Sequence, residues 1–404
     1  MTDHPARGRL RLPPLPLATF FVVAGTMGTR PTIPLRAVEL GLSATEVGIL
    51  VAVFALVPLI GTIPAGGWMD RNGTARALPC AVLLTSLGLA LPWLLHGALG
   101  LYASQLVTGC GFTIYILGAQ KTAGAAGDGP QGREKAIAVF SLAVALGAFA
   151  GPFFTGFLGD LAGLEEALAL AALLGLVSLV ILPLIPARQT AGRADAALVA
   201  PPAQPAEAPA DAGRDRRPWR VLGYHRYMGR AFLISSFVLL AKDFYMAYFP
   251  LLALENGMSV ALIGVIIGLH NGGGVIMRVF QLRLVGTFGK SAVVITSILF
   301  SGICLLLVPF LSVVWTLTAV SIVMGMGLGL GQPLSISTTI NLSPDGKSGE
   351  VLGFRLTCNR LTQFVTPLGF GGIVAVAGLA GAFWAVGAAL VLGSLRLHIP
   401  DAET

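Results

Sequence analysis

A few ionisable residues interrupt the long apolar stretches of this sequence, and their side chains are the ones best suited to bind or transfer charge. At the centre of a membrane, an ionised side chain costs roughly 2.5–3.5 kcal/mol on insertion scales unless it faces water or a partner. Such a residue therefore marks a functional site or a specific pairing. The candidates of this kind are Arg30, Lys242, Asp243, His270 and Arg360.

Asp243 is the acid that lies well inside an apolar stretch, and it is the candidate proton carrier. A medium of low dielectric favours the neutral carboxyl, which can take up and release a proton, unless a cation holds the charged form. A buried ion pair with Arg30 or Arg360 is the equally weighted alternative. Lys242 is the neighbour of Asp243, but adjacent residues on a helix point about 100° apart and pair poorly.

Arg30, Lys242 and Arg360 could recognise an anion, because guanidinium and ammonium groups donate hydrogen bonds to carboxylate and phosphate. For Arg30 and Lys242, substrate contact or gating competes evenly with structural pairing, whereas anion binding is slightly favoured for Arg360. His270 is expected to be a hydrogen-bonded core or cavity residue rather than a ligand. Three amides complete the candidate binding site: Asn271, Asn359 and Gln363.

Membrane-spanning helices must position these residues. The 404-residue chain is 55% hydrophobic and 11% charged, which is far more apolar than a soluble protein. About 20 apolar residues cross the roughly 30 Å hydrocarbon core, and continuous runs without a two-residue period indicate helices rather than a barrel. The predicted fold class is all-α integral membrane. Twelve helices are expected at about 15–38, 46–68, 76–96, 100–122, 136–159, 165–186, 228–253, 260–284, 291–311, 314–340, 351–377 and 380–397.

The connections between these helices differ in charge. If the helices alternate in direction, the lysines and arginines of the connections fall on one side, while the other side carries acids and only Arg36 at a helix end. This positive-inside bias predicts that both termini and the long central loop are cytoplasmic. The same distribution argues against a nucleic-acid partner, despite the net charge of +7. We expect a bacterial inner (cytoplasmic) membrane protein.

A polar, Pro- and Ala-rich segment separates two groups of six helices. It cannot bury a core, so a flexible cytoplasmic linker is predicted there. The expected domains are an N-terminal six-helix bundle at 1–187, the linker at 188–226 and a C-terminal six-helix bundle at 227–404.

The two groups repeat each other in sequence. A shift of 216 residues aligns 34–43 with 250–259 and Gly48 with Gly264, and a shift of 215 aligns Pro152 with Pro367. Parallel repeats of this kind are typical of secondary transporters, which bind substrate near the midplane between the halves.

The connection after the second predicted helix is a charged turn over 66–76, where glycine allows a sharp change of direction. It resembles the loop between spans two and three of the major facilitator superfamily, with Thr74 and Ala75 in place of a basic pair. The resemblance implies that superfamily's fold, with 12 transmembrane helices in two pseudo-symmetric six-helix bundles. It also implies a gating contact between the Asp70–Arg71 pair and the start of span eleven. The gating residues are then Gly66, Asp70, Arg71, Gly73, Arg76 and Arg355.

The fifth predicted helix carries a second motif, made of Gly147, Gly151, Pro152 and Gly156. It resembles a motif of the superfamily's 12-span drug:proton antiporter-like branch, with Thr155 in place of one glycine. Small residues four apart allow close helix packing, and proline bends a helix. Simple packing is therefore as good an explanation as an antiport signature.

These features predict a secondary active transporter and no enzyme, since no metal-ligand spacing or catalytic motif is present. The leading hypothesis is proton-coupled efflux of a small organic molecule by alternating access, with the proton as coupling ion and no other cofactor. The alternative is uptake or exchange of a small organic anion. A non-transporting membrane receptor or a lipid-handling protein is the remote alternative. The expected partners are a small-molecule substrate and membrane lipid, and the chain is expected to be a monomer.

Overall fold

The computed structural model describes residues 14–126, 129–190, 218–344 and 347–399, and every structural statement below concerns these ranges. Most of the predicted linker, residues 191–217, lies outside them. Within the described ranges the regular structure is helical and contains no strand.

The first half of the chain forms six long helices. They are α1 (Pro14–Glu39), α2 (Ala44–Asn72), α3 (Ala77–Leu95), α4 (Ala98–Gly124), α5 (Gly129–Ala162) and α6 (Leu164–Ile181). A 3-10 turn, η1 (Leu182–Leu184), and a short helix, α7 (Ala187–Thr190), follow them. The predicted helices of this half are confirmed, with ends that differ by several residues.

The second half forms five long helical elements, the last of which contains two helices. They are α9 (Met228–Glu255), α10 (Val260–Phe288), α11 (Lys290–Leu307), α12 (Val314–Asn341) and α13 (Ser348–Ser394), with 3-10 turns η2 (Pro218–Gly223) and η3 (Val308–Phe310). The 47-residue α13 is two helices joined at Gly378, whose φ of 70° and ψ of 176° are not helical. This break lies between the two spans predicted at 351–377 and 380–397. The described residues therefore contain the predicted twelve long helices.

Ten of the described helices meet a length and hydropathy criterion for crossing a membrane, with α13 counted once. The helix α1 is not among them, because threonines, glycines and prolines surround Arg30 and lower its hydropathy. The segment around Arg30 that lowers the hydropathy of α1 is therefore also the segment that carries its candidate functional residue.

One sequence expectation about α2 is wrong. The whole segment from Gly66 to Arg76 was predicted as a turn, but α2 remains helical to Asn72, and the turn is confined to residues 73–76. The amide of Asn72 donates to the carbonyl oxygen of Trp68 at 3.0 Å. The helix ends at Gly73, whose φ of 73° is easily adopted only by glycine.

The two halves start their second helices in the same way. Ser43 caps α2 and Ser259 caps α10, each with its hydroxyl accepting a hydrogen bond from the backbone N–H three residues later. Gly41 and Gly257, two residues before each cap, have φ values of 78° and 74°. Both pairs are separated by 216 residues, so the sequence repeat is also a repeat of local geometry.

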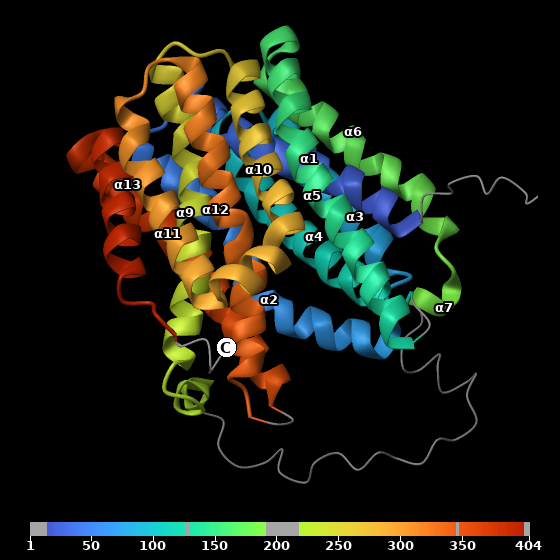
Figure 1. The fold of residues 1–404 in the computed structure, drawn as a ribbon. Helices are drawn as coiled ribbons and strands as arrows, with labels where there is room; N and C mark the ends of the chain where they lie inside the picture. The colour runs from blue at the N-terminus through green and yellow to red at the C-terminus, as the bar shows by residue number, and fades with distance from the viewer. Residues whose placement is uncertain (1–13, 127–128, 191–217, 345–346, 400–404) are drawn as a thin grey trace, which may run out of the picture.

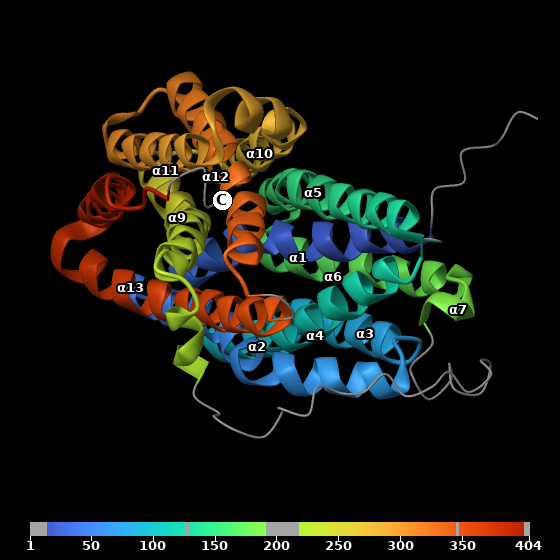
Figure 2. The same ribbon diagram turned by 60° about the horizontal axis from the view of Figure 1, so that its bottom comes forward.

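The halves meet at two crossings related by the same repeat. A Cβ atom on Gly264 of α10 would lie 2.2 Å from the carbonyl oxygen of Pro152 in α5. A Cβ atom on Gly48 of α2 would lie 2.4 Å from the carbonyl oxygen of Pro367 in α13. Glycine is therefore required at both positions. Figures 1 and 2 show the two crossings: α5 lies against α10, and α13 passes over α2.

Hydrogen bonds also join the halves at the end where α1 turns into α2 and α9 turns into α10, which we call the joined face. The carboxylate of Asp160, near the end of α5, accepts hydrogen bonds from the backbone N–H groups of Val260 and Ala261 at 2.9 and 3.0 Å. The hydroxyl of Thr45 donates to the carbonyl oxygen of Gly371 at 3.0 Å. In this structure the two halves are thus held together at the joined face.

Candidate functional site

The buried acid Asp243 lies in the middle of α9. Its side chain is only 8% exposed, and its Oδ2 atom is buried without a hydrogen-bond partner. Arg30 from α1 and Arg360 from α13 both act on it electrostatically. The structure therefore brings together an acid of the second half with one cation from each half.

Arg30 is held by an aromatic ring rather than by the acid. The guanidinium carbon of Arg30 lies 4.2 Å from the centroid of the Phe54 ring in α2, which is cation–π geometry. Its Nε atom is buried and has no hydrogen-bond partner. Within the described residues, no ion pair shorter than 4.0 Å joins Asp243 to Arg30 or Arg360, so the direct pairing considered from the sequence is absent in this conformation.

Lys242 lines a different space from its neighbour. A cavity of about 100 Å³ lies among α5, α9, α10 and α12, at the boundary between the halves. The first half contributes small apolar residues of α5, and the second half contributes the polar ones. The polar residues lining the cavity are Lys242, His270, Asn271, Arg278 and Gln332.

His270 is fixed within the wall of this cavity. Its Nδ1 atom lies 2.9 Å from the carbonyl oxygen of Ser321, and its ring stacks on Tyr245 with centroids 4.7 Å apart. A carbonyl oxygen can only accept, so Nδ1 must carry the hydrogen and donate. Its neighbour Asn271 donates to the carbonyl oxygen of Ala148 in α5 at 3.0 Å and so connects the two halves.

The polar residues of α13 divide into two groups. Arg355 donates from Nη2 to Gln332 Oε1 at 2.7 Å, and Asn359 Oδ1 accepts from the Ser235 hydroxyl at 2.7 Å. These contacts stay within the second half. Gln363 instead accepts from Arg360 Nη1 at 2.8 Å, and Arg360 interacts electrostatically with Asp243.

The predicted gating residues are only partly described. Arg71 and Arg76 are exposed at the end of α2 and in the turn that follows. The side chain of Asp70 lies outside the described residues. Arg355 donates a hydrogen bond to Gln332 of α12, and its gating contact with the Asp70 loop stays a prediction.

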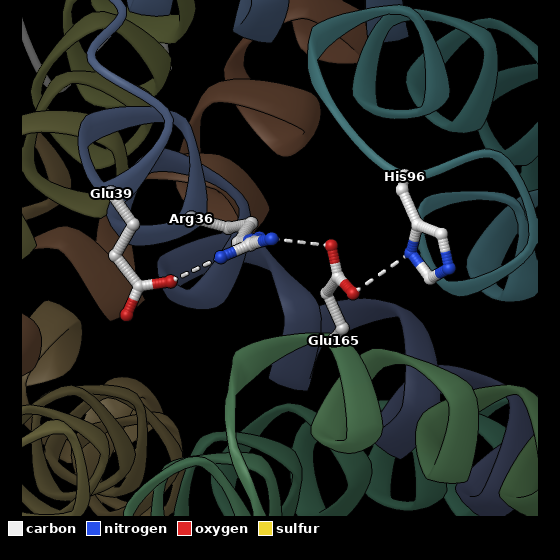
Figure 3. A network of polar contacts seen from close by, with 4 residues as sticks. All are labelled: Arg36, Glu39, His96 and Glu165. Atoms are coloured by element: carbon white, nitrogen blue, oxygen red, sulfur yellow. Dashed lines mark hydrogen bonds and ion pairs between the residues drawn. The ribbon is translucent and has the colours of Figure 1, made fainter.

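A separate ionic network reinforces the first half at the joined face (Figure 3). Arg36 contacts Glu39 at 2.8 Å and also contacts Glu165, while His96 lies 3.1 Å from the second carboxylate oxygen of Glu165. The network connects the end of α1 and the start of α6 to the α3–α4 turn. It involves none of the candidate binding residues, so its role is structural.

The comparison with protein families agrees with this architecture. The Major Facilitator Superfamily matches the chain over residues 15–287 and again over 231–403. The chain belongs to the Major Facilitator Superfamily. The search of curated proteins found no match. As a member of this superfamily, the chain is an integral membrane protein of a transporter family.

Solved structures of other transporters share the fold. A POT family transporter in complex with 5-aminolevulinic acid has a TM-score of 0.75 and 16% identity, with 97% of each chain covered. A POT family transporter in complex with a thioalcohol-conjugated peptide has a TM-score of 0.74 and 16% identity, covering 95% of this chain and 94% of that one.

A bacterial homologue of the human lysosomal transporter Spinster, in an inward-facing and unoccupied conformation, is also similar. Its TM-score is 0.71 at 14% identity, covering 95% of this chain and 93% of the other. At such low identities these similarities establish the superfamily fold and not the substrate.

The α5 motif of this superfamily member packs on both sides. Cβ atoms on Gly147 and Gly151 would lie 2.8 and 2.3 Å from carbonyl oxygens of α1, in the same half. Pro152 and Gly156 instead contact α10 of the other half, where a Cβ on Gly156 would lie 2.8 Å from the Val260 carbonyl oxygen. The motif therefore forms one of the two crossings between the halves.

Three residues of the site were not among those proposed from the sequence: Phe54, Arg278 and Gln332. Arg278 lies eight residues after His270 on the same helix, so helical spacing could have placed both on one face. Gln332 is a polar residue within an apolar, glycine-rich helix, which was a usable signal. Phe54 gave no signal, because an aromatic residue in an apolar run is ordinary.

Proposed function

We propose that the protein is a proton-coupled secondary transporter of a small organic anion. The observation that carries this proposal is the charge of the cavity between the halves. Lys242 and Arg278 line it, and none of its lining residues is acidic. A cation at membrane depth is unfavourable unless an anion lies close to it, so an anionic cargo would supply the missing charge.

The position of the cavity supports alternating access. Val144, Ala145 and Ala148 of the first half face the cations of the second half across it. A cargo there contacts both halves, so its binding energy differs between conformations in which the halves lie differently. Such a difference is what a ligand needs in order to shift a conformational equilibrium.

Asp243 supports coupling to a proton. Deprotonated, it attracts Arg30 of the first half and Arg360 of the second half; protonated, it attracts neither. Proton binding at this carboxyl would therefore change how strongly α1 is drawn to the second half. The unpartnered Oδ2 atom leaves a position at which a proton can be bound.

Export is the direction that we propose, because the α5 motif resembles that of the drug:proton antiporter-like branch. Uptake or exchange is the second candidate, favoured by the excess of cations over acids, since cations can bind an anion without any proton movement. Among the structural neighbours, one POT family transporter was captured with 5-aminolevulinic acid, which shows that the fold can hold a small organic molecule in that protein.

The charge bias of the connections supports a bacterial inner membrane location with both termini in the cytoplasm. We take the single chain as the functional unit, because the candidate site is assembled from the two halves of one chain. Small-molecule cargo and membrane lipid are then its expected partners, with the proton as coupling ion.

The test uses purified protein in liposomes with an imposed pH gradient and a panel of anionic, neutral and cationic organic compounds. Asp243→Asn should abolish gradient-driven accumulation of the cargo and leave cargo exchange intact, because the neutral amide mimics a carboxyl that is always protonated. Unchanged accumulation would remove Asp243 from the mechanism. Transport of only neutral or cationic compounds would contradict the anionic cargo.

A further inference from the structure

We propose that the cavity among α5, α9, α10 and α12 binds a small dianion, with Lys242 and Arg278 each pairing with one negative charge. This inference rests on the proposed anion transport and adds the valence of the cargo to it. The ligand class is a compact molecule with two negative charges, such as a short dicarboxylate or a phosphate.

The charges of the whole region favour a ligand with more than one negative charge. Lys242 and Arg278 are close enough to repel each other, and Arg30 adds to the repulsion at Lys242. Asp243 is the acid that acts on Lys242, and it is shared with Arg30 and Arg360. These four cations and one acid leave an excess of three positive charges. A monoanion leaves two of them unbalanced, whereas a dianion leaves one.

Both cations have donors available. The ammonium group of Lys242 donates no hydrogen bond to any described residue. Arg278 uses its Nε group on the carbonyl oxygen of Gly329 at 3.2 Å, and no partner is found for its two Nη groups within the described residues. A guanidinium group can hold a carboxylate or a phosphate through two parallel hydrogen bonds.

The helices fix the position of Arg278 closely. A Cβ atom on Gly329 of α12 would lie 2.4 Å from the Cα atom of Gly274, one turn before Arg278 on α10. This close contact sets the distance between the two helices, and the Nε hydrogen bond then anchors the guanidinium group to α12. Because Arg278 is held in place before any ligand arrives, binding loses little side-chain entropy.

The size of the cavity selects small ligands. Its volume of about 100 Å³ has room for several water-sized groups. That is the scale of a phosphate or of a short dicarboxylate, and it is too small for a large drug-like molecule in this conformation.

The test is a calorimetric titration of the purified full-length chain at pH 8 with four probes. Succinate represents the dicarboxylates and phosphate represents itself, and both are mainly dianions at this pH. Sulfate is a dianion whose charge does not change with pH in this range. Succinamate is a monoanion of nearly the same size as succinate. Wild type should bind at least one of the dianions about tenfold more tightly than succinamate. Tight succinate binding would identify a dicarboxylate site, and tight phosphate binding would identify a phosphate site.

Variants assign the two charges to their residues. Lys242→Gln and Arg278→Gln should each reduce the preference for dianions to less than about threefold, while Arg278→Lys should keep it. Arg283→Gln is the matched control, since both arginines are exposed on the same helix and only Arg278 lines the cavity. Melting curves of each variant check that it is folded, and the Arg278→Lys result carries the argument if Arg278→Gln does not fold.

Several outcomes would overturn the dianion site. These are equal affinity for succinate and succinamate, no binding of any dianion, or a preference that survives both glutamine substitutions. Equal affinity for the two would still leave anion transport standing. Failure to bind or carry any anion, with transport of neutral or cationic compounds, would reject the proposed function itself.

Discussion

At the scale of single residues, the site depends on two charged neighbours that face different surroundings. Lys242 lines the cavity beside Arg278, whereas Asp243 is associated with Arg30 and Arg360. Their separation follows from the helix, on which adjacent side chains point about 100° apart. A binding position and a proton position can therefore lie next to each other in α9, with the acid acting on Lys242 and shared with Arg30 and Arg360.

Arg30 provides the prediction at this scale. Phe54→Leu removes the ring on which its guanidinium group lies, while keeping an apolar side chain. A desolvated cation–π contact contributes up to about 2 kcal/mol, so we expect a loss of about 1–2 kcal/mol in stability and a lower melting temperature. Phe54→Tyr keeps the ring and should behave like wild type. Equal melting temperatures for the leucine and tyrosine variants would show that the contact contributes nothing measurable.

The depth of the charged residues could be predicted from the sequence, but their partners could not. The apolar runs place Arg30, Asp243 and Arg360 inside the membrane, however each helix is rotated or packed. Which of them touch depends on the rotation of each helix about its axis, and this is set by packing against several other helices. That is why the direct ion pair of Asp243 was considered and is absent, and why the contact of Arg30 with Phe54 was missed.

At the scale of helices, one contact is used twice. Gly264 of α10 packs on Pro152 of α5, and Gly48 of α2 packs on Pro367 of α13. The sequence aligned Gly48 with Gly264 and Pro152 with Pro367, so it identified all four participants. It could not show that each glycine meets the proline of the other half, because the alignment relates equivalent positions and not contacts.

Gly264→Ala tests the crossing of α5 and α10. The added methyl group would lie 2.2 Å from a backbone carbonyl oxygen, so the two helices must separate. Overpacking of this kind costs about 1–3 kcal/mol, and we expect a lower melting temperature of the purified protein. Gly286→Ala is the control, since that glycine is on the same helix and a Cβ there would meet nothing within 4 Å. Equal stability of the two variants would mean that the crossing adapts freely.

At the scale of the whole molecule, composition was enough to predict a membrane protein, the apolar runs were enough to predict twelve helices, and the internal repeat was enough to predict two halves. The relative position of the halves was beyond the sequence, because a transporter chain must be compatible with more than one arrangement of the same helices. This structure shows the arrangement in which Asp160 and Thr45 hold the joined face together.

Asp160→Ala should loosen the joined face. The carboxylate accepts two backbone hydrogen bonds at the start of α10, where the N-terminal end of the helix also favours a negative charge. Because Asp160 is exposed, water replaces part of this energy, and we expect a shift in the conformational equilibrium of about three- to tenfold rather than unfolding. The population of molecules whose joined face is open is measured as the labelling rate of a cysteine introduced in place of Tyr248, a buried residue near the joined face.

Two comparisons complete this experiment. Asp160→Asn keeps one side-chain carbonyl oxygen as an acceptor and should give an intermediate labelling rate. Glu166→Gln removes another exposed acid near the joined face, in the first half, and should leave the rate unchanged. If Asp160→Ala and Glu166→Gln label at the same rate, the hydrogen bonds of Asp160 do not hold the halves together. The glycine crossings would then be sufficient to keep this face closed, since they involve backbone contacts that neither substitution alters.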